Sequence, residues 1–295
     1  MYNPQLETFI QVVEAGSFNK AAEKMFISPP AVIKQMNLLE RSIGIALFVR
    51  THRGLVLTEG GKSFYQDAKY IMQYCKDSVI RAQNAMKVED DVIKIGTSPM
   101  TPAQTLIGAW HKLQQVCPNT KFQLVPFVNT PENAREILKN LGQNIDVVAG
   151  IFDDTMLHVR KCAGLEISRV PICCAVSINH KLAYKNKLSV QDLYGENFML
   201  MHRGWSNYVD MLRDELWKNH PQINLVDIHF YDVDIFNRCE NSNDILMAIE
   251  NWQQVHPLLK IIPVQWNYTI PFGILHSPNP TKKVKRFLEA VKQIM

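Results

Sequence analysis

The 295-residue sequence lacks the features that would identify a membrane or secreted protein. It has no run of about 18 consecutive apolar residues, so we expect no membrane-spanning helix. Its first residues show no basic segment followed by an apolar core, which a secretory signal would have. The sequence therefore predicts a cytoplasmic protein with no membrane partner.

Metal-binding and common enzymatic motifs are also missing. The six cysteines form no C-x-x-C pair, and no histidine stands at metal-ligand spacing. We therefore predict no metal site and reduced, mostly buried thiols. Phosphate-binding glycine loops and the motifs of serine hydrolases and zinc proteases are absent. Two pairs of acids, Asp153 with Asp154 and Asp232 with Asp234, are interpreted as solvated loop residues. The sequence predicts no cofactor and no enzyme.

Charge is nearly balanced overall but uneven along the chain. The formal net charge is +4, yet residues 17–58 contain six Lys and Arg residues and only two Glu residues. Such a local excess of cations permits a nucleic-acid partner without requiring one. The apolar content of 46% is that of an ordinary globular protein, and the length favours two or three domains.

The first sixty residues have the pattern of three short helices followed by a hairpin. Gly16 ends the first helix, Ser17 caps the second, and Ser28 caps a third that Gly44 ends. Two β-favouring runs then flank a basic tip at residues 50–54. This order predicts a winged helix-turn-helix domain over residues 1–58.

A long helix is predicted over residues 59–90. Apolar and small side chains recur there at alternating spacings of four and three, which is typical of a helix that pairs with another helix. We expect dimerisation through this helix, because the flanking segments offer no obvious local partner. The alternative is a long helix that lies on its own domain. The seam residues are Phe64, Ala68, Ile71, Cys75 and Ala82.

After residue 90, strand-like runs alternate with helical ones, which indicates a parallel sheet covered by helices. The pattern occurs twice, so we expect two α/β lobes: lobe I over residues 91–165 plus 268–295, and lobe II over residues 166–267. Such lobes enclose a cleft that commonly holds a ligand. The predicted fold class is therefore α+β multidomain: a winged helix-turn-helix, a long linker helix and a bilobed α/β effector domain over residues 91–295.

Residues 6–61 resemble the DNA-binding region of LysR-type transcriptional regulators. The shared pattern is EAGSF, K-AA, SxPAV, Q-x-x-x-LE, G-x-x-LF-x-R and R-G-x-x-LTE-x-G, all at fixed offsets. The order of the remaining parts also fits that family. The resemblance implies a homodimer or homotetramer that binds promoter or operator DNA. It also implies a domain similar to periplasmic binding proteins that holds a small-molecule effector.

The resemblance further implies which residues contact DNA. The third helix would enter the major groove and the hairpin would reach the minor groove. Lys34 stands where the family usually has arginine, and Pro29 and Ile33 stand where it usually has glutamine and serine. We therefore expect an altered operator sequence. The expected DNA-binding residues are Ser17, Ser28, Pro30, Ile33, Lys34, Gln35, Arg50 and Arg53.

The effector site is expected between the lobes. The segment 98–102 links a strand to a helix start, where hydroxyls and free N–H groups can hold a carboxylate. A cation across the cleft would favour an anionic effector. Where the family commonly has a glycine, this chain has Trp252, which could fill or reshape the site. The expected effector-binding residues are Ser98, Met100, Thr101, His202 and Arg203.

A second hypothesis remains open at this point. The chain could be a small-molecule-binding protein or an enzyme whose N-terminal helices serve only oligomerisation. The cations of the third helix and the hairpin favour the regulator, because an oligomerisation module has no need of them on one side.

Overall fold

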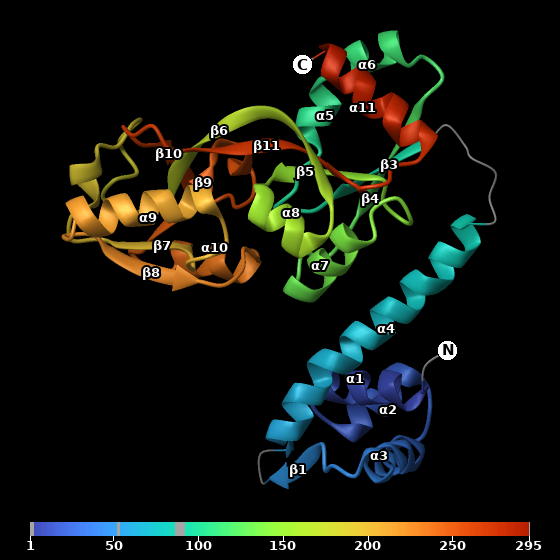
Figure 1. Cartoon of the computed structure of the whole chain (residues 1–295). Coiled ribbons are helices and arrows are strands. Elements are labelled where there is room, and N and C mark those ends of the chain that lie inside the picture. The colour runs from blue at the N-terminus through green and yellow to red at the C-terminus, as the bar shows by residue number, and fades with distance from the viewer. Residues whose placement is uncertain (1–2, 52–53, 86–91, 295) are drawn as a thin grey trace. The chain divides into compact units, whose positions relative to one another are not determined.

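The computed structural model describes residues 3–51, 54–85 and 92–294 (Figure 1). The chain divides into two compact units, Met1–Met86 and Lys87–Met295. Within the described residues, no helix is long and apolar enough to cross a membrane. The same residues contain no group of three or more His, Cys, Asp or Glu side chains that could hold a metal ion.

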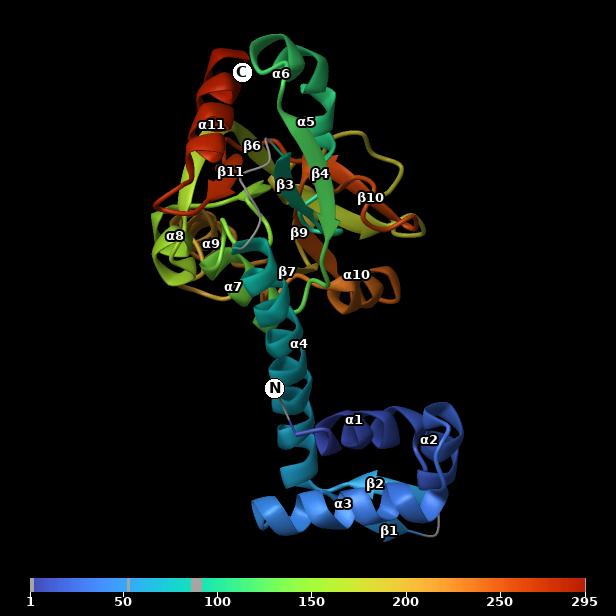
Figure 2. The same cartoon turned by 90° about the vertical axis from the view of Figure 1, so that its right-hand side faces the viewer.

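The first unit contains the predicted order of elements. Three helices precede a two-stranded antiparallel sheet, and a 27-residue helix follows. The elements are α1 Gln5–Ala15, α2 Phe18–Met25, α3 Pro29–Ile43, β1 Phe48–Thr51, β2 Gly54–Leu57 and α4 Glu59–Ala85. Helix α3 and the β1–β2 hairpin lie on the same side of this unit (Figure 2).

Most of the predicted helix ends are confirmed. Gly16 and Gly44 adopt the left-handed conformation, with φ of 69° and 71°, and end α1 and α3. The Ser17 hydroxyl accepts a hydrogen bond from the Lys20 amide at 3.2 Å and caps α2. These caps separate the three helices at the places that the sequence predicts.

The capping role predicted for Ser28 is wrong. Within the described part of the chain its hydroxyl makes no capping hydrogen bond. The next two residues are prolines without N–H groups, and the Ala31 amide already bonds to the Ser28 carbonyl oxygen at 2.9 Å. The Ser28 hydroxyl therefore remains exposed at the start of α3.

The core of the first unit also includes the beginning of α4. Phe9, Val32 and Leu47 are 0% exposed in this core, and so is Ala68 of α4. Phe64 packs against the same cluster. The expectation that α4 has no local partner is therefore wrong for its first half, because Phe64 and Ala68 pack within their own unit.

The second unit is built on a nine-stranded sheet of the order β4-β3-β5-β11-β6-β9-β7-β8, with β10 paired to β6. The strands are β3 Val92–Thr97, β4 Lys121–Pro126, β5 Val147–Ile151, β6 Ala163–Ser177, β7 Asn197–Met201, β8 Asn224–Ile228, β9 Ile245–Ile249, β10 Leu259–Pro263 and β11 Thr269–His276. The helices are α5 Gln104–Gly108, α6 Trp110–Val116, α7 Pro131–Lys139, α8 Asp154–Arg160, α9 Asn207–Asn219, α10 Val233–Glu240 and α11 Lys282–Ile294. Two short 3₁₀ segments are η1 Val190–Leu193 and η2 Glu250–Trp252.

The 15-residue strand β6 runs through both halves of this unit. The first part of β6 pairs with β11, and its last part pairs with β9 and β10 (Figure 1). Parallel strands β3, β4 and β5 form one half, while β7, β8 and β9 form the other. We keep the names lobe I and lobe II for these halves, with the bounds proposed from the sequence.

The interpretation of the paired acids as solvated loop residues is wrong for Asp153. This side chain is 5% exposed, and its Oδ1 accepts a hydrogen bond from the Met156 amide at 2.8 Å. Asp232 likewise accepts from the Ile235 amide at 2.9 Å. These two carboxylates cap α8 and α10, which the hydrophobic pattern did not reveal because each is a short helix.

Candidate functional site

Helix α3 turns one face to the core and another to solvent. Val32, Met36 and Leu39 are at most 1% exposed and hold the helix on the unit. Pro30 and Lys34 are exposed on the other face, and Ile33 beside them is half-buried. Because residues spaced by three and four share a helix face, these three side chains form one continuous surface.

Gln35 has a role that the sequence did not suggest. Its Oε1 accepts a hydrogen bond from the Thr8 hydroxyl of α1, and the side chain is half-buried. The bond joins α1 to α3. The amide nitrogen of Gln35 is the polar atom left for an outside partner, so a contact to DNA remains a prediction for that atom.

The hairpin is attached to α3 through Glu40. Its Oε1 accepts hydrogen bonds from the Leu47 amide at 2.6 Å and the Phe48 amide at 3.2 Å. The carboxylate thus fixes the start of β1 relative to α3. Arg50 lies opposite Leu55 in the hairpin register, but its side chain is outside the described residues. Arg53 also lies outside them.

The end of the hairpin is held close to α4. The Thr58 hydroxyl accepts from the Gly61 amide at 2.8 Å and donates to the Ala46 carbonyl at 2.7 Å. A Cβ atom on Gly61 would lie 3.0 Å from the Leu47 carbonyl carbon and within clashing distance of its oxygen. Glycine at this position allows the backbones of α4 and the hairpin to meet.

The turn between α2 and α3 carries a feature that sequence reasoning missed. Phe26 has φ of 56°, a left-handed conformation that is costly for a bulky side chain, and it is 95% exposed. Nothing in the core uses this ring. The signal in the sequence was an aromatic residue in a tight turn between two capped helices. Strained positions of this kind are common at functional surfaces.

The later part of α4 exposes an apolar stripe. Ile71 is 39% exposed and Val79 is 44% exposed, while Cys75 is half-buried and Ala82 is exposed. This part of the predicted seam is open to a partner, in contrast to Phe64 and Ala68.

The segment expected to hold an effector forms a closed turn. Ser98 and Thr101 exchange backbone hydrogen bonds of 3.4 and 3.1 Å, and their hydroxyl oxygens lie 2.8 Å apart. The expected free N–H groups at these two residues are therefore already satisfied. Met100 is 7% exposed, and the helix that follows is only five residues long.

The two residues expected across the boundary between the lobes point to local partners. The Arg203 guanidinium forms an ion pair with Asp214 of α9, and this hydrogen bond raises the pKa of Arg203. The half-buried His202 places Nδ1 2.9 Å from the Arg203 carbonyl oxygen. Within the described part of the chain, neither residue forms a hydrogen bond with the 98–101 turn.

Trp252 joins the two lobes directly. Its indole N–H donates to the Met100 carbonyl oxygen at 3.0 Å, and the side chain is 4% exposed. The ring packs against Tyr231, with centroids 4.7 Å apart, and meets Phe236 edge to face. The tryptophan therefore fills space beside the turn in which an effector was expected.

Two further hydrogen bonds cross between the lobes. Asp153 of lobe I accepts from the Asn207 amide, at the N-terminus of α9 in lobe II, at 2.7 Å. Asn129 of lobe I donates to the Tyr231 carbonyl oxygen at 2.7 Å. A carboxylate of the chain itself thus occupies the helix N-terminus that an anionic ligand would favour.

Comparison with known proteins agrees with the architecture of the first unit. Residues 4–62 match the family model described as "Bacterial regulatory helix-turn-helix protein, lysR family". The matched segment contains α1, α2, α3, the hairpin and the start of α4.

Curated relatives match over part of their length. The Hca operon transcriptional activator HcaR of Escherichia coli is 28% identical over 194 residues, which cover 66% of this chain and 63% of that protein. The HTH-type transcriptional regulator TfdT of Cupriavidus pinatubonensis is 43% identical over 91 residues, covering 31% of this chain and 40% of that protein. The chain thus spans less than two thirds of these relatives.

Solved structures match over the whole chain. The crystal structure of CbnR, a LysR family transcriptional regulator, has a TM-score of 0.57 at 17% identity and covers 99% of both chains. Full-length CbnR complexed with its target DNA has a TM-score of 0.55 at 17% identity and covers 100% of both chains. At this identity the likeness concerns the fold alone, and it agrees with the predicted fold class.

Proposed function

Because residues 4–62 match the lysR family of bacterial regulatory helix-turn-helix proteins, we propose that the chain is a LysR-type regulator that binds double-stranded promoter DNA and regulates transcription in the cytoplasm. The observation that carries this proposal is the exposed face of α3, where Lys34 stands beside Pro30 and Ile33. The N-terminal part of α3 would enter the major groove, and Arg50 and Arg53 of the hairpin would approach the minor groove.

The absence of a side-chain cap at Ser28 supports a phosphate contact at the start of α3. The hydroxyl is exposed and lies at a helix N-terminus, where phosphate oxygens are bound favourably. Ser17 already uses its hydroxyl oxygen as a cap, and that hydroxyl can still donate a hydrogen bond. Phosphate contacts would fix the position of α3 without specifying sequence.

Sequence preference would come from the residues that differ from the family pattern. Ile33 offers only an apolar contact, such as one to a thymine methyl group, and Pro29 has no amide side chain. Replacing Pro29 with Gln and Ile33 with Ser should shift operator preference and leave non-specific affinity unchanged. Selection of binding sites from a random duplex pool measures this, and an unchanged site preference would contradict it.

We further propose that the chain acts as a homodimer or homotetramer joined through the later part of α4. Ile71, Cys75 and Ala82 would form the seam together with the exposed Val79. Phe64 and Ala68 would act indirectly, by fixing α4 on the first unit. Contacts of this kind need apolar side chains at positions three and four apart, which this stretch provides.

Effector binding is proposed between the lobes, at the turn containing Ser98, Met100 and Thr101, with His202 of lobe II as a further contact. An effector there would have to compete with Trp252 for the Met100 carbonyl oxygen. An anionic effector would also have to displace Asp153 from the N-terminus of α9. Since Arg203 is paired with Asp214, its contact to an effector would require that pair to open.

The proposal is tested by a gel shift of the full chain with the DNA upstream of its own coding sequence. We expect a specific shift that weakens as salt is raised, because phosphate contacts release counterions. No shift, or a shift that salt does not change, would favour the alternative in which the N-terminal helices serve only oligomerisation. The matched relatives are named as transcriptional regulators, which supports the regulator over an enzyme.

Thermal-shift screening of metabolites against the full chain tests the effector proposal. A ligand that binds only the folded state raises the melting temperature. A hit should lose its effect when Thr101 is replaced by Val, which keeps the volume and removes the hydroxyl.

A further inference from the structure

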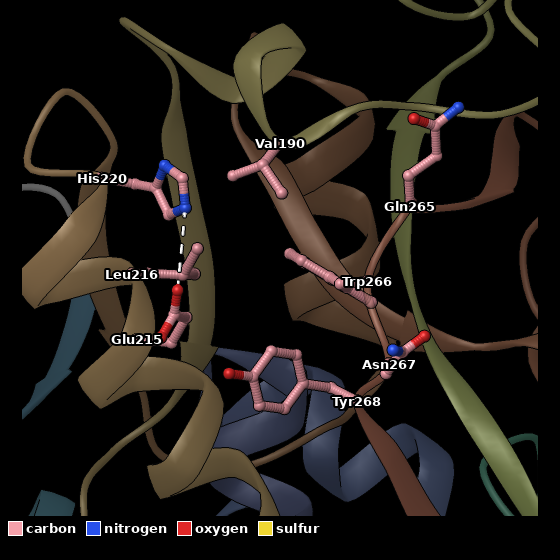
Figure 3. Close-up of a pocket in the computed structure, with 8 residues that line it drawn as sticks. All are labelled: Val190, Glu215, Leu216, His220, Gln265, Trp266, Asn267 and Tyr268. Carbon is pink, nitrogen blue, oxygen red and sulfur yellow. Dashed lines mark ion pairs between the residues drawn. The ribbon is translucent and has the colours of Figure 1, made fainter.

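A pocket of about 480 Å³, lined by residues of lobe II and by Tyr268, is not used by the proposed function (Figure 3). Glu215, Leu216 and His220 line it from α9 and the residue that follows the helix. The segment 265–268 between β10 and β11 lines the opposite side, and Val190 of η1 completes it. The pocket shares no lining residue with the 98–101 turn, His202, Arg203 or Trp252. Its volume is within the range of small-molecule sites.

The side chains of Trp266 and Tyr268 form one wall of this pocket, and hydrogen bonds hold the Trp266 ring and the Tyr268 backbone in place. The Trp266 indole N–H donates to the Ile172 carbonyl oxygen at 2.7 Å, which fixes the ring against β6. The Tyr268 carbonyl oxygen accepts from the Ile172 amide at 2.9 Å. The two ring centroids are 6.2 Å apart and the planes are nearly perpendicular, at 84°. A ligand would therefore meet preformed aromatic surfaces.

The opposite wall carries a carboxylate. The Glu215 side chain is 39% exposed, and its Oε1 lies 3.9 Å from His220 Nε2, too far for a direct hydrogen bond. The His220 ring is oriented by its other nitrogen, which lies 2.9 Å from the Tyr194 hydroxyl. Burial raises the pKa of the Tyr268 phenol, and the negative charge of Glu215 raises it further. The Glu215 carboxylate therefore acts electrostatically on the Tyr268 side chain of the aromatic wall.

The charge of the lining favours a cation over an anion. The eight lining residues include no Lys or Arg, and His220 is positive only when protonated. Aromatic faces attract cations, and a carboxylate pairs with an ammonium group. Leu216 and Val190 add apolar surface, while Gln265 and Asn267 supply neutral polar groups.

We propose that this pocket binds a small organic cation, with an ammonium group at Glu215 and the ring of Tyr268, and an apolar body against Leu216, Val190 and Trp266. The pocket shares no residue with the proposed DNA-binding surface or with the proposed effector site. The proposed cation binding can therefore be tested independently of the proposed function.

Calorimetric titration of the full chain at neutral pH tests the proposal with three probes of similar shape. These are phenethylammonium, the neutral 2-phenylethanol and the anionic phenylacetate. We expect saturable binding of phenethylammonium and at least about tenfold weaker binding of the other two, since a cation–π contact together with an ion pair accounts for a factor of this size. Equal binding of the alcohol and the amine, or no binding of the amine at millimolar concentration, would overturn the proposal.

Two substitutions assign the binding to this pocket. Glu215→Gln keeps the shape of the side chain and should weaken phenethylammonium about tenfold, and Tyr268→Leu should weaken it by a similar factor. Glu289→Gln on α11 is the matched control, because Glu289 is exposed and pairs with Lys292 away from the pocket, and it should leave binding unchanged. Undiminished binding to the Glu215→Gln protein would place the amine elsewhere and refute the assignment.

Discussion

Replacement of Trp252 by Phe should loosen the contact between the lobes. The phenyl ring retains most of the packing against Tyr231, but the Met100 carbonyl oxygen loses the hydrogen bond that it now accepts at 3.0 Å. A buried acceptor left without a partner costs about 1–3 kcal/mol. In a unit of this size, about 2 kcal/mol corresponds to a fall in melting temperature of roughly 4–8 °C.

Trp266→Phe is a matched control for this change. Trp266 also donates its indole N–H to a backbone carbonyl, that of Ile172, but both residues lie in lobe II. The two variants should therefore lose similar amounts of stability. Only Trp252→Phe should affect the hydrogen bond that crosses between the lobes from the Asn207 amide to Asp153.

Hydrogen exchange followed by mass spectrometry distinguishes the two variants. We expect faster exchange in peptides that contain residues 98–101 and Asn207 for Trp252→Phe, and little change there for Trp266→Phe. Identical exchange profiles for the two proteins would refute the inference that Trp252 holds the lobes together. An unchanged melting temperature for Trp252→Phe would refute the estimated cost of the lost bond.

Three further predictions concern the first unit. Gly61→Ala should lower the melting temperature of this unit, with a loss of about 1–3 kcal/mol of unfolding free energy, because the new methyl group meets the Leu47 carbonyl. Gly60→Ala is the control, because its methyl group would meet side-chain atoms of Ile45 and Thr58 and no backbone atom. Equal effects of the two substitutions would contradict the packing described. Phe26→Asn should raise the melting temperature and add about 1 kcal/mol to the free energy of unfolding, since Asn tolerates the left-handed conformation and removal of the exposed ring loses no packing. A lower melting temperature would show that the ring is needed for folding. Ile71→Glu should convert dimers to monomers in sedimentation velocity without unfolding the chain, and a persistent dimer would rule out the α4 seam.

The ends of the helices in the first unit could be predicted because the sequence signals for them are local. Gly16, Ser17 and Gly44 act on residues within one helical turn, so their positions in the sequence are sufficient. Ser28 failed as a cap for an equally local reason, since Pro29 and Pro30 have no N–H group and the Ala31 amide bonds to the Ser28 carbonyl oxygen instead. The two prolines are visible in the sequence, but a rule that considers only the capping residue ignores them.

The contacts between the lobes could not be predicted in this way. Trp252 and Met100 are 152 residues apart, and no spacing rule relates an indole to a distant carbonyl. Asp153 resembled a surface residue because it stands next to another acid, whereas the fold buries it between two helix starts. The packing of Ala68 on its own unit was hidden for a similar reason, because a seam pattern does not identify the partner that it meets.

The salt dependence of DNA binding by the Lys34→Gln protein tests whether α3 binds DNA. Fluorescence anisotropy with a labelled upstream duplex over a series of salt concentrations gives the slope of log K against log salt, which reflects the number of phosphate contacts. We expect weaker binding at low salt and a slope smaller in magnitude by about one for Lys34→Gln, and no change for Lys112→Gln, which replaces an exposed lysine of the second unit. Affinity and slope equal to those of the unaltered protein would contradict the assignment of α3 as the DNA-binding helix.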